Sequence, residues 1–238
     1  PFINNFLFLA LAIFVCPPVH APETKRIDYE GFSVWVDCDK RSAVKFNTMP
    51  NITLVVINLL NISIDPNTPS SFQQLSAKTY KQKGQRYDRG HLVPANRLDY
   101  SKVATRQSNF MINILPQAAS MNRGAWVLTE EKTECYRDID ELLIIGDVLS
   151  DNLNDDFFTE SHGVKTPDAF WKVIIYNDRA IAWIIPNSAD TKRDRIDHYI
   201  VTIQELEWVT GESMPVDGYI KYEKPEYSWV IPRGCNKG

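Results

Sequence analysis

A short segment, Asp88-Arg89-Gly90-His91, combines side chains that suit phosphate chemistry. In an extended segment, Arg89 and His91 share a face, with no side chain on Gly90 between them. The planar guanidinium of Arg89 can bind phosphate oxygens. Its charge also opposes protonation of His91, which favours the neutral imidazole that a general base requires. The alternative is structural: an ion pair between Asp88 and Arg89 beside a histidine of the core.

A second group of polar side chains follows at residues 121–130, which read M-N-R-G-A-W-V-L-T-E. On a helix, Asn122, Trp126 and Glu130 are each four residues apart and can line one side. An amide oxygen and a carboxylate on one stripe suit Mg²⁺, which prefers oxygen ligands and keeps several waters. The alternative makes Asn122 the N-terminal cap of the helix and Glu130 a solvated charge.

Three blocks follow one another along the chain: D-R-G-H, N-I-x-P-Q and M-N-R-G-A-W-x-L-x-E. In this order and spacing they resemble the DNA/RNA non-specific endonuclease family. The resemblance is strongest from Arg86 to Glu130 and continues through residues 144–146 and 166–174, roughly the middle half of the chain. It implies an α+β domain with a ββα-metal (His-Me finger) active site and a central antiparallel sheet flanked by helices.

The same resemblance implies an activity: Mg²⁺-dependent hydrolysis of phosphodiester bonds in DNA and RNA, with Mn²⁺ as a substitute for Mg²⁺. The products would carry 5′-phosphate and 3′-hydroxyl ends. By motif, His91 matches the general base, and Asn122 matches the direct protein ligand of the metal. Glu130 matches a carboxylate that hydrogen-bonds the metal's waters, Arg89 matches a phosphate-binding arginine, and Asn113 is expected to be architectural.

One departure from the family pattern is the lack of any arginine between Arg41 and Arg86. The family usually has an arginine upstream of D-R-G-H that faces the leaving phosphate, and here the corresponding stretch is the uncharged Ile52–Ile64. Either a lysine of residues 78–83 replaces it, or transition-state stabilisation is weaker. The alternative function is a catalytically weak or inactive module that binds nucleic acid. A zinc hydrolase needs more closely spaced His or Cys ligands than this sequence has.

Composition is that of an ordinary globular protein: 238 residues, 44% hydrophobic and 24% charged. Lys and Arg total 26 against 30 Asp and Glu, which gives a net charge of −4. That balance argues against a protein that coats nucleic acid by bulk charge, but it allows an enzyme with a local basic groove. Basic residues from Lys78 to Arg89, with Arg123, are expected to line this groove. The candidate substrate-binding residues for DNA and RNA are Lys83, Arg89 and Arg123.

Hydrophobic patterns predict the elements that must position these residues. Apolar runs predict strands at residues 31–37, 142–148, 170–176 and 180–185. Helical patterns are found at residues 121–131 and 191–209, and Gly211 can cap the second helix. Lys172, within a strand, is either structural or a distal phosphate contact. No repeat or linker divides the chain, so we expect one mixed α+β domain over about residues 22–238.

Residues 1–21 include an uninterrupted apolar run, Phe6–Val15, which is too short to span a bilayer and fits a secretory signal. Val19-His20-Ala21 offers a cleavage pattern, so a secreted or periplasmic protein is expected. The alternative is a buried N-terminal strand or helix. After such cleavage three cysteines remain, enough for one disulfide and one free thiol in a pairing that the sequence leaves open: Cys38, Cys135 and Cys235.

Overall fold

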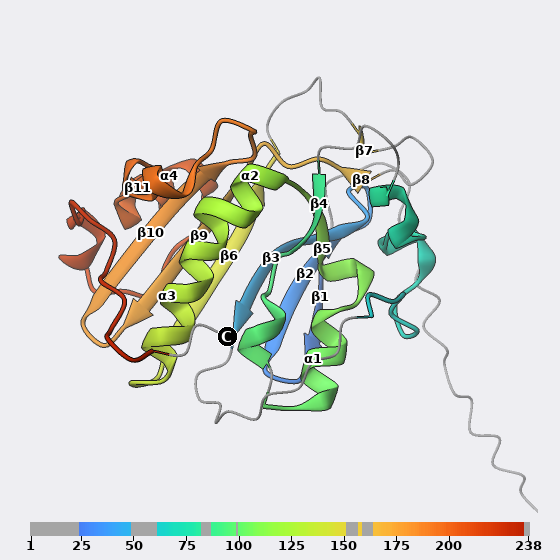
Figure 1. Cartoon of the computed structure of the whole chain (residues 1–238), viewed down its shortest axis with the longest axis horizontal. Helices are drawn as coiled ribbons and strands as arrows, with labels where there is room; N and C mark the ends of the chain where they lie inside the picture. The colour runs from blue at the N-terminus through green and yellow to red at the C-terminus, as the bar shows by residue number, and fades with distance from the viewer. Residues whose placement is uncertain are drawn as a thin grey trace, which may run out of the picture.

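The computed structural model describes residues 24–48, 61–81, 87–98, 100–150, 157–158 and 164–235 (Figure 1). The predicted secretory segment 1–21, the candidate Lys83 and most of the uncharged stretch Ile52–Ile64 lie outside these ranges. Within the described ranges, no helix combines the length and apolar character needed to cross a membrane.

A seven-stranded sheet forms the centre of the fold, and every pair of neighbouring strands in it is antiparallel. In order across the sheet, its strands are β1 (Thr24–Tyr29), β2 (Phe32–Asp37), β3 (Ser42–Thr48), β6 (Leu143–Leu149), β9 (Ala169–Tyr176), β10 (Arg179–Pro186) and β11 (Ile200–Val201). The predicted α+β class with a central antiparallel sheet is confirmed. The strands predicted at residues 31–37, 142–148, 170–176 and 180–185 correspond to β2, β6, β9 and β10.

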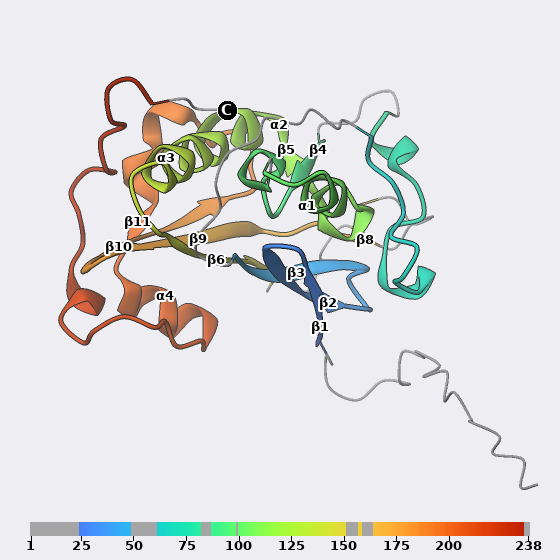
Figure 2. The ribbon, with the colours of Figure 1, turned by 90° about the horizontal axis from the view of Figure 1, so that it is seen from below.

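Helices and short strands surround this sheet. The α-helices are α1 (Lys102–Ser108), α2 (Ala119–Met121), α3 (Val127–Arg137) and α4 (Ile203–Thr210). Two further strand pairs are β4 (Tyr87–His91) with β5 (Ile114–Ala118) and β7 (Phe157–Phe158) with β8 (Val164–Lys165). In Figure 2, α1, α3 and the β4–β5 pair lie on one face of the large sheet, and α4 lies on the other.

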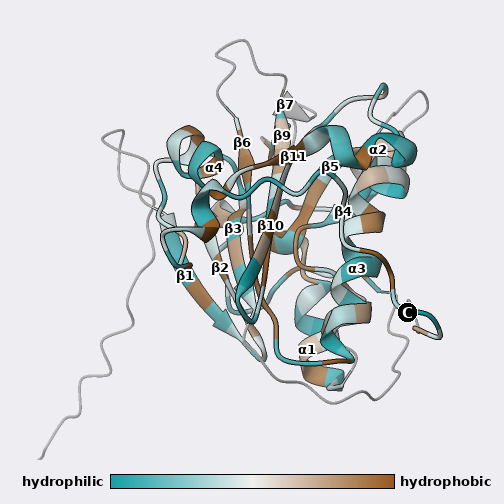
Figure 3. Cartoon of the chain, turned by 90° about the vertical axis from the view of Figure 1, so that its left-hand side faces the viewer, coloured by the Kyte–Doolittle hydropathy of each residue, from teal (hydrophilic) through white to brown (hydrophobic). Residues whose placement is uncertain are grey.

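Strand β9 shows how the sheet separates the two layers. Phe170 and Ile174 belong to the core that includes Trp126 of the α3 side, whereas Trp171 and Val173 pack with Leu206 of α4. Successive side chains of a strand point to opposite faces, so a strand covered on both faces is apolar at most positions. Figure 3 shows this as hydrophobic colour along the strands that lie between the two helical layers. The layer that contains α3 and the β4–β5 pair is therefore built on a buried sheet.

The single helix predicted at residues 191–209 is wrong. The structure divides this stretch into the 3₁₀ helix Arg193–Tyr199, strand β11 and helix α4. Thr202 starts α4 with a capping box: its hydroxyl accepts a hydrogen bond from Glu205 N at 2.9 Å, and Glu205 accepts one from Thr202 N at 2.7 Å. Thr202 is extended, with ψ 157°, which interrupts the helix. Gly211 does cap α4, with φ 71°.

The C-terminal segment that contains Trp229 and Cys235 contacts α3 and is covalently linked to it. A disulfide joins Cys135 of α3 to Cys235, 100 positions later in the sequence. Lys132 Nζ donates a hydrogen bond to the carbonyl of Trp229 at 2.6 Å, and the ring of Tyr136 lies 5.1 Å from that of Trp229. The predicted disulfide is therefore present. Cys38 is also disulfide-bonded in the full-length chain, so the free thiol expected after removal of residues 1–21 stays a prediction.

We expect Cys235→Ser to lower the free energy of unfolding by about 2–5 kcal/mol, the usual cost of removing a native disulfide. The bond closes a loop of 100 residues, so its removal increases the freedom of the unfolded chain. Urea unfolding of the variant and of the wild type under oxidising conditions measures the difference. Equal midpoints and equal slopes would contradict a stabilising role for this disulfide.

Candidate active site

Strand β4 presents the D-R-G-H segment and pairs with β5, with Asp88 opposite Gln117 and His91 opposite Ile114. Gly90 is required by close packing, because a Cβ at this position would lie 2.0 Å from Gln117 Cδ. The Gln117 amide crosses the strand here and donates a hydrogen bond to the carbonyl of His91 at 3.3 Å. Any side chain at position 90 would displace this contact, which helps to fix the backbone of His91.

One ring nitrogen of His91 is held by Asn109. His91 Nε2 lies 3.2 Å from Asn109 Oδ1, and Asn109 Nδ2 donates to the carbonyl of Thr105 at 2.8 Å, which fixes the orientation of the amide. An oxygen acceptor at Nε2 selects the tautomer that carries its proton there and leaves Nδ1 as the base. Burial lowers the pKa of His91 below its ordinary value; the Asn109 hydrogen bond opposes this effect, and the charge of Arg89 adds to it.

Asn109 is the residue whose role the sequence reasoning missed. It stands at the head of the N-F-M-I-N-I-L-P-Q stretch, so the motif contains it, but no spacing rule connects it to His91, 18 positions away. Asn113, in the same stretch, makes all its described side-chain hydrogen bonds to backbone groups. Its Oδ1 accepts from Val93 N, and its Nδ2 donates to the carbonyls of Val93 and Ser108. Asn113 therefore ties the β4–β5 connection together, while Asn109 orients the imidazole.

Asp88 connects the strand to the helix that follows β5. Its carboxylate accepts a hydrogen bond from Asn122 Nδ2 at 3.0 Å and two from the Arg123 guanidinium, at 2.8 and 2.6 Å. Asn122 is thereby brought to the strand that bears Arg89 and His91. Arg123 is largely exposed, but it forms an ion pair with Asp88. Arg89 is also exposed, and within the described part of the chain it forms no ion pair. Arg89 is thus the more available of the two for a phosphate.

The helix predicted at residues 121–131 is present, but its first part is a π-helix, Asn122–Trp126, between α2 and α3. Asn122, Trp126 and Glu130 were expected to line one side of this helix, and for Trp126 this expectation is wrong. Trp126 is fully buried and packs on Phe170, with ring centroids 5.4 Å apart. A π turn takes more residues than an α turn, so the four-residue spacing rule fails across it. Asn122 and Glu130 are both partly exposed.

Glu130 lies eight residues after Asn122, or about 12 Å along an ideal helix axis. Because helical side chains lean over the preceding turn, we expect the Glu130 side chain to reach back along the helix towards Trp126. Burial raises the pKa of Glu130, and the positive charge of Lys172 acts against this increase. Lys172 itself is fully buried, so its alternative assignment as a distal phosphate contact is wrong.

The donor set around Asn122 fits a hard cation such as Mg²⁺. Asp88 accepts from the amide nitrogen of Asn122, so the amide oxygen is left as a ligand; within the described residues it makes no hydrogen bond. Mg²⁺ needs few protein ligands, because waters and substrate oxygens complete its coordination. The described residues include no cluster of three or more His, Cys, Asp or Glu side chains suited to a metal ion.

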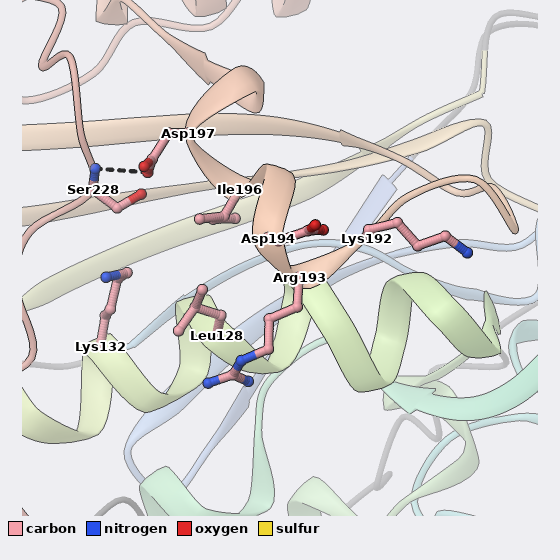
Figure 4. A pocket seen from close by; sticks show the side chains of 8 residues that line it. All are labelled: Leu128, Lys132, Lys192, Arg193, Asp194, Ile196, Asp197 and Ser228. Atoms are coloured by element: carbon pink, nitrogen blue, oxygen red, sulfur yellow. Dashed lines mark hydrogen bonds between the residues drawn. The ribbon is translucent and has the colours of Figure 1, made fainter.

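A separate open pocket lies between α3 and the 3₁₀ helix Arg193–Tyr199 (Figure 4). Leu128 and Lys132 of α3 line one side, and Arg193, which forms an ion pair with Glu131, lines the other. None of its lining residues comes from β4 or β5. The candidate active site is therefore the β4–β5–helix unit, and this pocket lies beside it.

The two antiparallel strands β4 and β5 and the helix that follows them form a ββα unit, with the half-buried His91 on its first strand and Asn122 at the start of its helical segment. A model of the DNA/RNA non-specific endonuclease family matches residues 61–218. The chain belongs to the DNA/RNA non-specific endonuclease family.

Several known proteins are similar to this chain. The mitochondrial nuclease EXOG of Mus musculus is 27% identical over 166 residues, which are 62% of this chain and 44% of that protein. A nuclease of Nostoc sp. is 26% identical over 166 residues, covering 63% and 58% of the two chains. The mitochondrial nuclease 1 of Schizosaccharomyces pombe is 25% identical over 215 residues, covering 79% and 64%. The matched part of the chain thus spans between 44% and 64% of the length of these relatives.

A chain in the crystal structure of the EndoG/EndoGI complex has the same fold. The two superpose with a TM-score of 0.67 at 17% sequence identity, over 79% of this chain and 84% of the other. At that identity the similarity concerns the arrangement of sheet and helices, and the chemistry has to be argued from the residues of this chain.

Proposed function

We propose that this chain is a Mg²⁺-dependent endonuclease that hydrolyses phosphodiester bonds of DNA and RNA and leaves 5′-phosphate and 3′-hydroxyl ends. One arrangement carries the proposal. The neutral imidazole of His91, held through Nε2 by Asn109, lies on the same strand as Asp88, which holds the amide of Asn122. A positioned base beside a hard-cation ligand is what hydrolysis of a phosphodiester requires.

In the proposed reaction, Nδ1 of His91 takes a proton from the water that attacks phosphorus. The new P–O bond forms as the bond to the 3′ oxygen breaks, and the 3′ oxygen takes its proton from water. Arg89 binds non-bridging phosphate oxygens and keeps the phosphate beside His91. Asn122 would hold the metal and Glu130 would orient its waters. When bound, the metal supplies positive charge that stabilises the phosphoryl oxygens and the leaving oxygen.

Digestion of plasmid DNA and of a structured RNA by the purified chain, with Mg²⁺ and with excess chelator, tests this proposal. We expect both substrates to be cut only with Mg²⁺, and the DNA fragments to be ligatable without prior phosphorylation, because ligation requires 5′-phosphate ends. Binding of both nucleic acids without cleavage would support the inactive module instead. Cleavage of one substrate alone would contradict the lack of sugar selectivity.

The pH dependence follows from the lowered pKa of His91. The reaction needs neutral His91, so kcat/KM should rise with pH through the pKa of the free enzyme and remain level above it. Because burial places that pKa below the ordinary 6.5, full activity should extend to mildly acidic pH and be lost only as the pH falls through the lowered value. A pH profile of kcat/KM on a short oligonucleotide measures it. A rise centred well above 6.5 would contradict a neutral His91 as the base.

We also propose a secreted or periplasmic protein in which residues 1–21 are a removable signal and about residues 22–238 form the nuclease domain. The support is the apolar run Phe6–Val15 together with the Cys135–Cys235 disulfide, since disulfides persist in oxidising compartments. Expression in a bacterial host, followed by fractionation and N-terminal sequencing, tests both points. A product that stays in the cytoplasm with residues 1–21 intact would contradict the proposal.

A further inference from the structure

Lys172 is a charged residue at the centre of the protein that the reaction described above does not use. It lies in the middle of β9, is 0% exposed, and is placed on the face of the sheet that supports α3. Gly146 of β6 lies opposite it, and the ring of Phe46 fills the place that a side chain at position 146 would take. A buried ammonium group is costly unless its surroundings compensate its charge, so the partners of Lys172 indicate its purpose.

The described contacts of Lys172 fall within one turn of the active-site helix. Its Nζ donates a hydrogen bond to Thr129 Oγ1 at 2.8 Å and lies 3.8 Å from the centroid of the Trp126 ring. Thr129 Oγ1 in turn donates to the carbonyl of Trp126 at 2.7 Å. The ammonium thus joins the end of the π segment to the start of α3. A cation against a buried aromatic face is strongly held, because no water competes for it.

The same turn ends at Glu130, the carboxylate whose position the proposed reaction needs. Of the neighbouring charges, Lys172 favours the ionised carboxylate, whereas Glu131 disfavours it, and Arg193 already pairs with Glu131. Lys172 lies beneath the helix and Glu130 at its partly exposed side, so substrate reaches the carboxylate without meeting the lysine. Glu130 therefore belongs to the surface that would contact the substrate, whereas Lys172 supports that surface from the buried side of the helix.

We propose that Lys172 is a positioning residue of the active site, which holds the turn Trp126–Glu130 in place and provides the buried positive charge that faces the Glu130 carboxylate. The inference rests on the proposed function, because it acts through Glu130. It predicts that loss of Lys172 lowers kcat and raises the Mg²⁺ concentration needed for half-maximal rate, in addition to any change in stability.

Lys172→Met is the first test, since methionine keeps most of the volume and removes the charge. At a temperature where circular dichroism shows the variant folded, we expect kcat to fall by about 10-fold or more and the Mg²⁺ concentration for half-maximal rate to rise, as for groups that support metal ligands. Lys132→Met is the matched control: Lys132 is also buried, on the same α3, but it donates to Trp229 at the C-terminal segment. It should lower the melting temperature and leave kcat and the Mg²⁺ response unchanged.

A double-mutant cycle with Glu130→Gln decides whether Lys172 acts through Glu130. If it does, adding Lys172→Met to the Glu130→Gln variant should lower kcat by less than about two-fold, because the effects of residues that act as one unit are not additive. Equal losses in both backgrounds would overturn the proposal, and so would full activity of Glu130→Gln. Neither result touches the nuclease assignment, which depends on His91 and Asn122.

If Lys172→Met does not fold, Thr129→Val serves in its place. It removes the oxygen that accepts from Lys172 Nζ and keeps the shape of the side chain. A raised Mg²⁺ requirement that disappears in the Glu130→Gln background supports the proposal. An unchanged Mg²⁺ titration in a folded Thr129→Val variant overturns it.

Discussion

His91→Ala should lower the rate of plasmid nicking by about 10²–10⁴-fold, the usual contribution of a general base. In the proposed mechanism the imidazole takes the proton from water at Nδ1, because Nε2 is engaged by Asn109. Because Arg89 and Asn122 are untouched, nucleic-acid binding and the melting temperature should change little. Initial rates on supercoiled plasmid, with binding measured separately in the presence of chelator, give both quantities.

His198→Ala is the matched control for that experiment. His198 is exposed on the 3₁₀ helix Arg193–Tyr199, well separated in sequence from β4 and β5, and its loss should leave the rate unchanged. A His91→Ala protein with wild-type activity would remove His91 from the mechanism. A His91→Ala protein that no longer binds DNA would mean that the residue contributes to binding or structure instead.

Asn122→Ala should raise the Mg²⁺ concentration needed for half-maximal rate by at least about 10–100-fold, the range seen even for groups that only support a metal ligand. The amide oxygen of Asn122 is the candidate direct ligand, and its nitrogen is fixed by Asp88 at 3.0 Å. Arg123 keeps its own two hydrogen bonds to Asp88, so the fold of the helix start should persist. The experiment is a Mg²⁺ titration of the cleavage rate for the variant and the wild type.

Ser120→Ala provides the control for Asn122→Ala. Ser120 lies on α2, two positions before Asn122, and its hydroxyl donates to the carbonyls of Ser188 and Ala189 away from Asp88. Its Mg²⁺ response should match that of the wild type. An Asn122→Ala variant whose rate is reduced equally at all Mg²⁺ concentrations would contradict the ligand role and favour a purely structural one.

Much of the candidate site was predictable because its residues stand in compact motifs. Arg89 and His91 are two positions apart on one strand, so spacing places them on one face, and the resemblance to the nuclease family then assigned their expected roles. The contact between His91 and Asn109 could not be predicted in this way, since it depends on how α1 ends next to β4. Trp126 was assigned to the wrong side of its helix, because a π segment changes the spacing on which the argument relied.

The main sheet was predicted well for a simple physical reason. Strands β6, β9 and β10 are buried and therefore read as apolar runs. The stretch 191–209 also shows a helical pattern of apolar residues, but Ile196, Ile200 and Leu206 reach the core from three different elements. The capping box Thr202-x-x-Glu205 was present in the sequence and would have placed the start of α4. Local capping chemistry was more informative there than periodicity.

The expected basic groove is altered by one contact. Arg123 was expected to face the substrate. Its guanidinium donates two hydrogen bonds to Asp88, so the carboxylate largely balances its positive charge. Lys78 and Arg89 are exposed, whereas Lys83 lies outside the described ranges. Binding that depends on few free cations should weaken as the salt concentration rises. The slope of log K against log salt concentration should be modest, because each phosphate contact on duplex DNA contributes about 0.9 to it.

The central claim is Mg²⁺-dependent phosphodiester hydrolysis at the site of His91 and Asn122. The most direct test is a time course of supercoiled plasmid with the wild type and with His91→Ala, each in Mg²⁺ and in chelator. The account predicts nicked and then linear and fragmented DNA for the wild type in Mg²⁺, DNA that stays almost entirely supercoiled over the same time for His91→Ala in Mg²⁺, and intact supercoiled DNA in both chelator reactions. Cleavage by His91→Ala at the wild-type rate, or by the wild type in chelator, would contradict it.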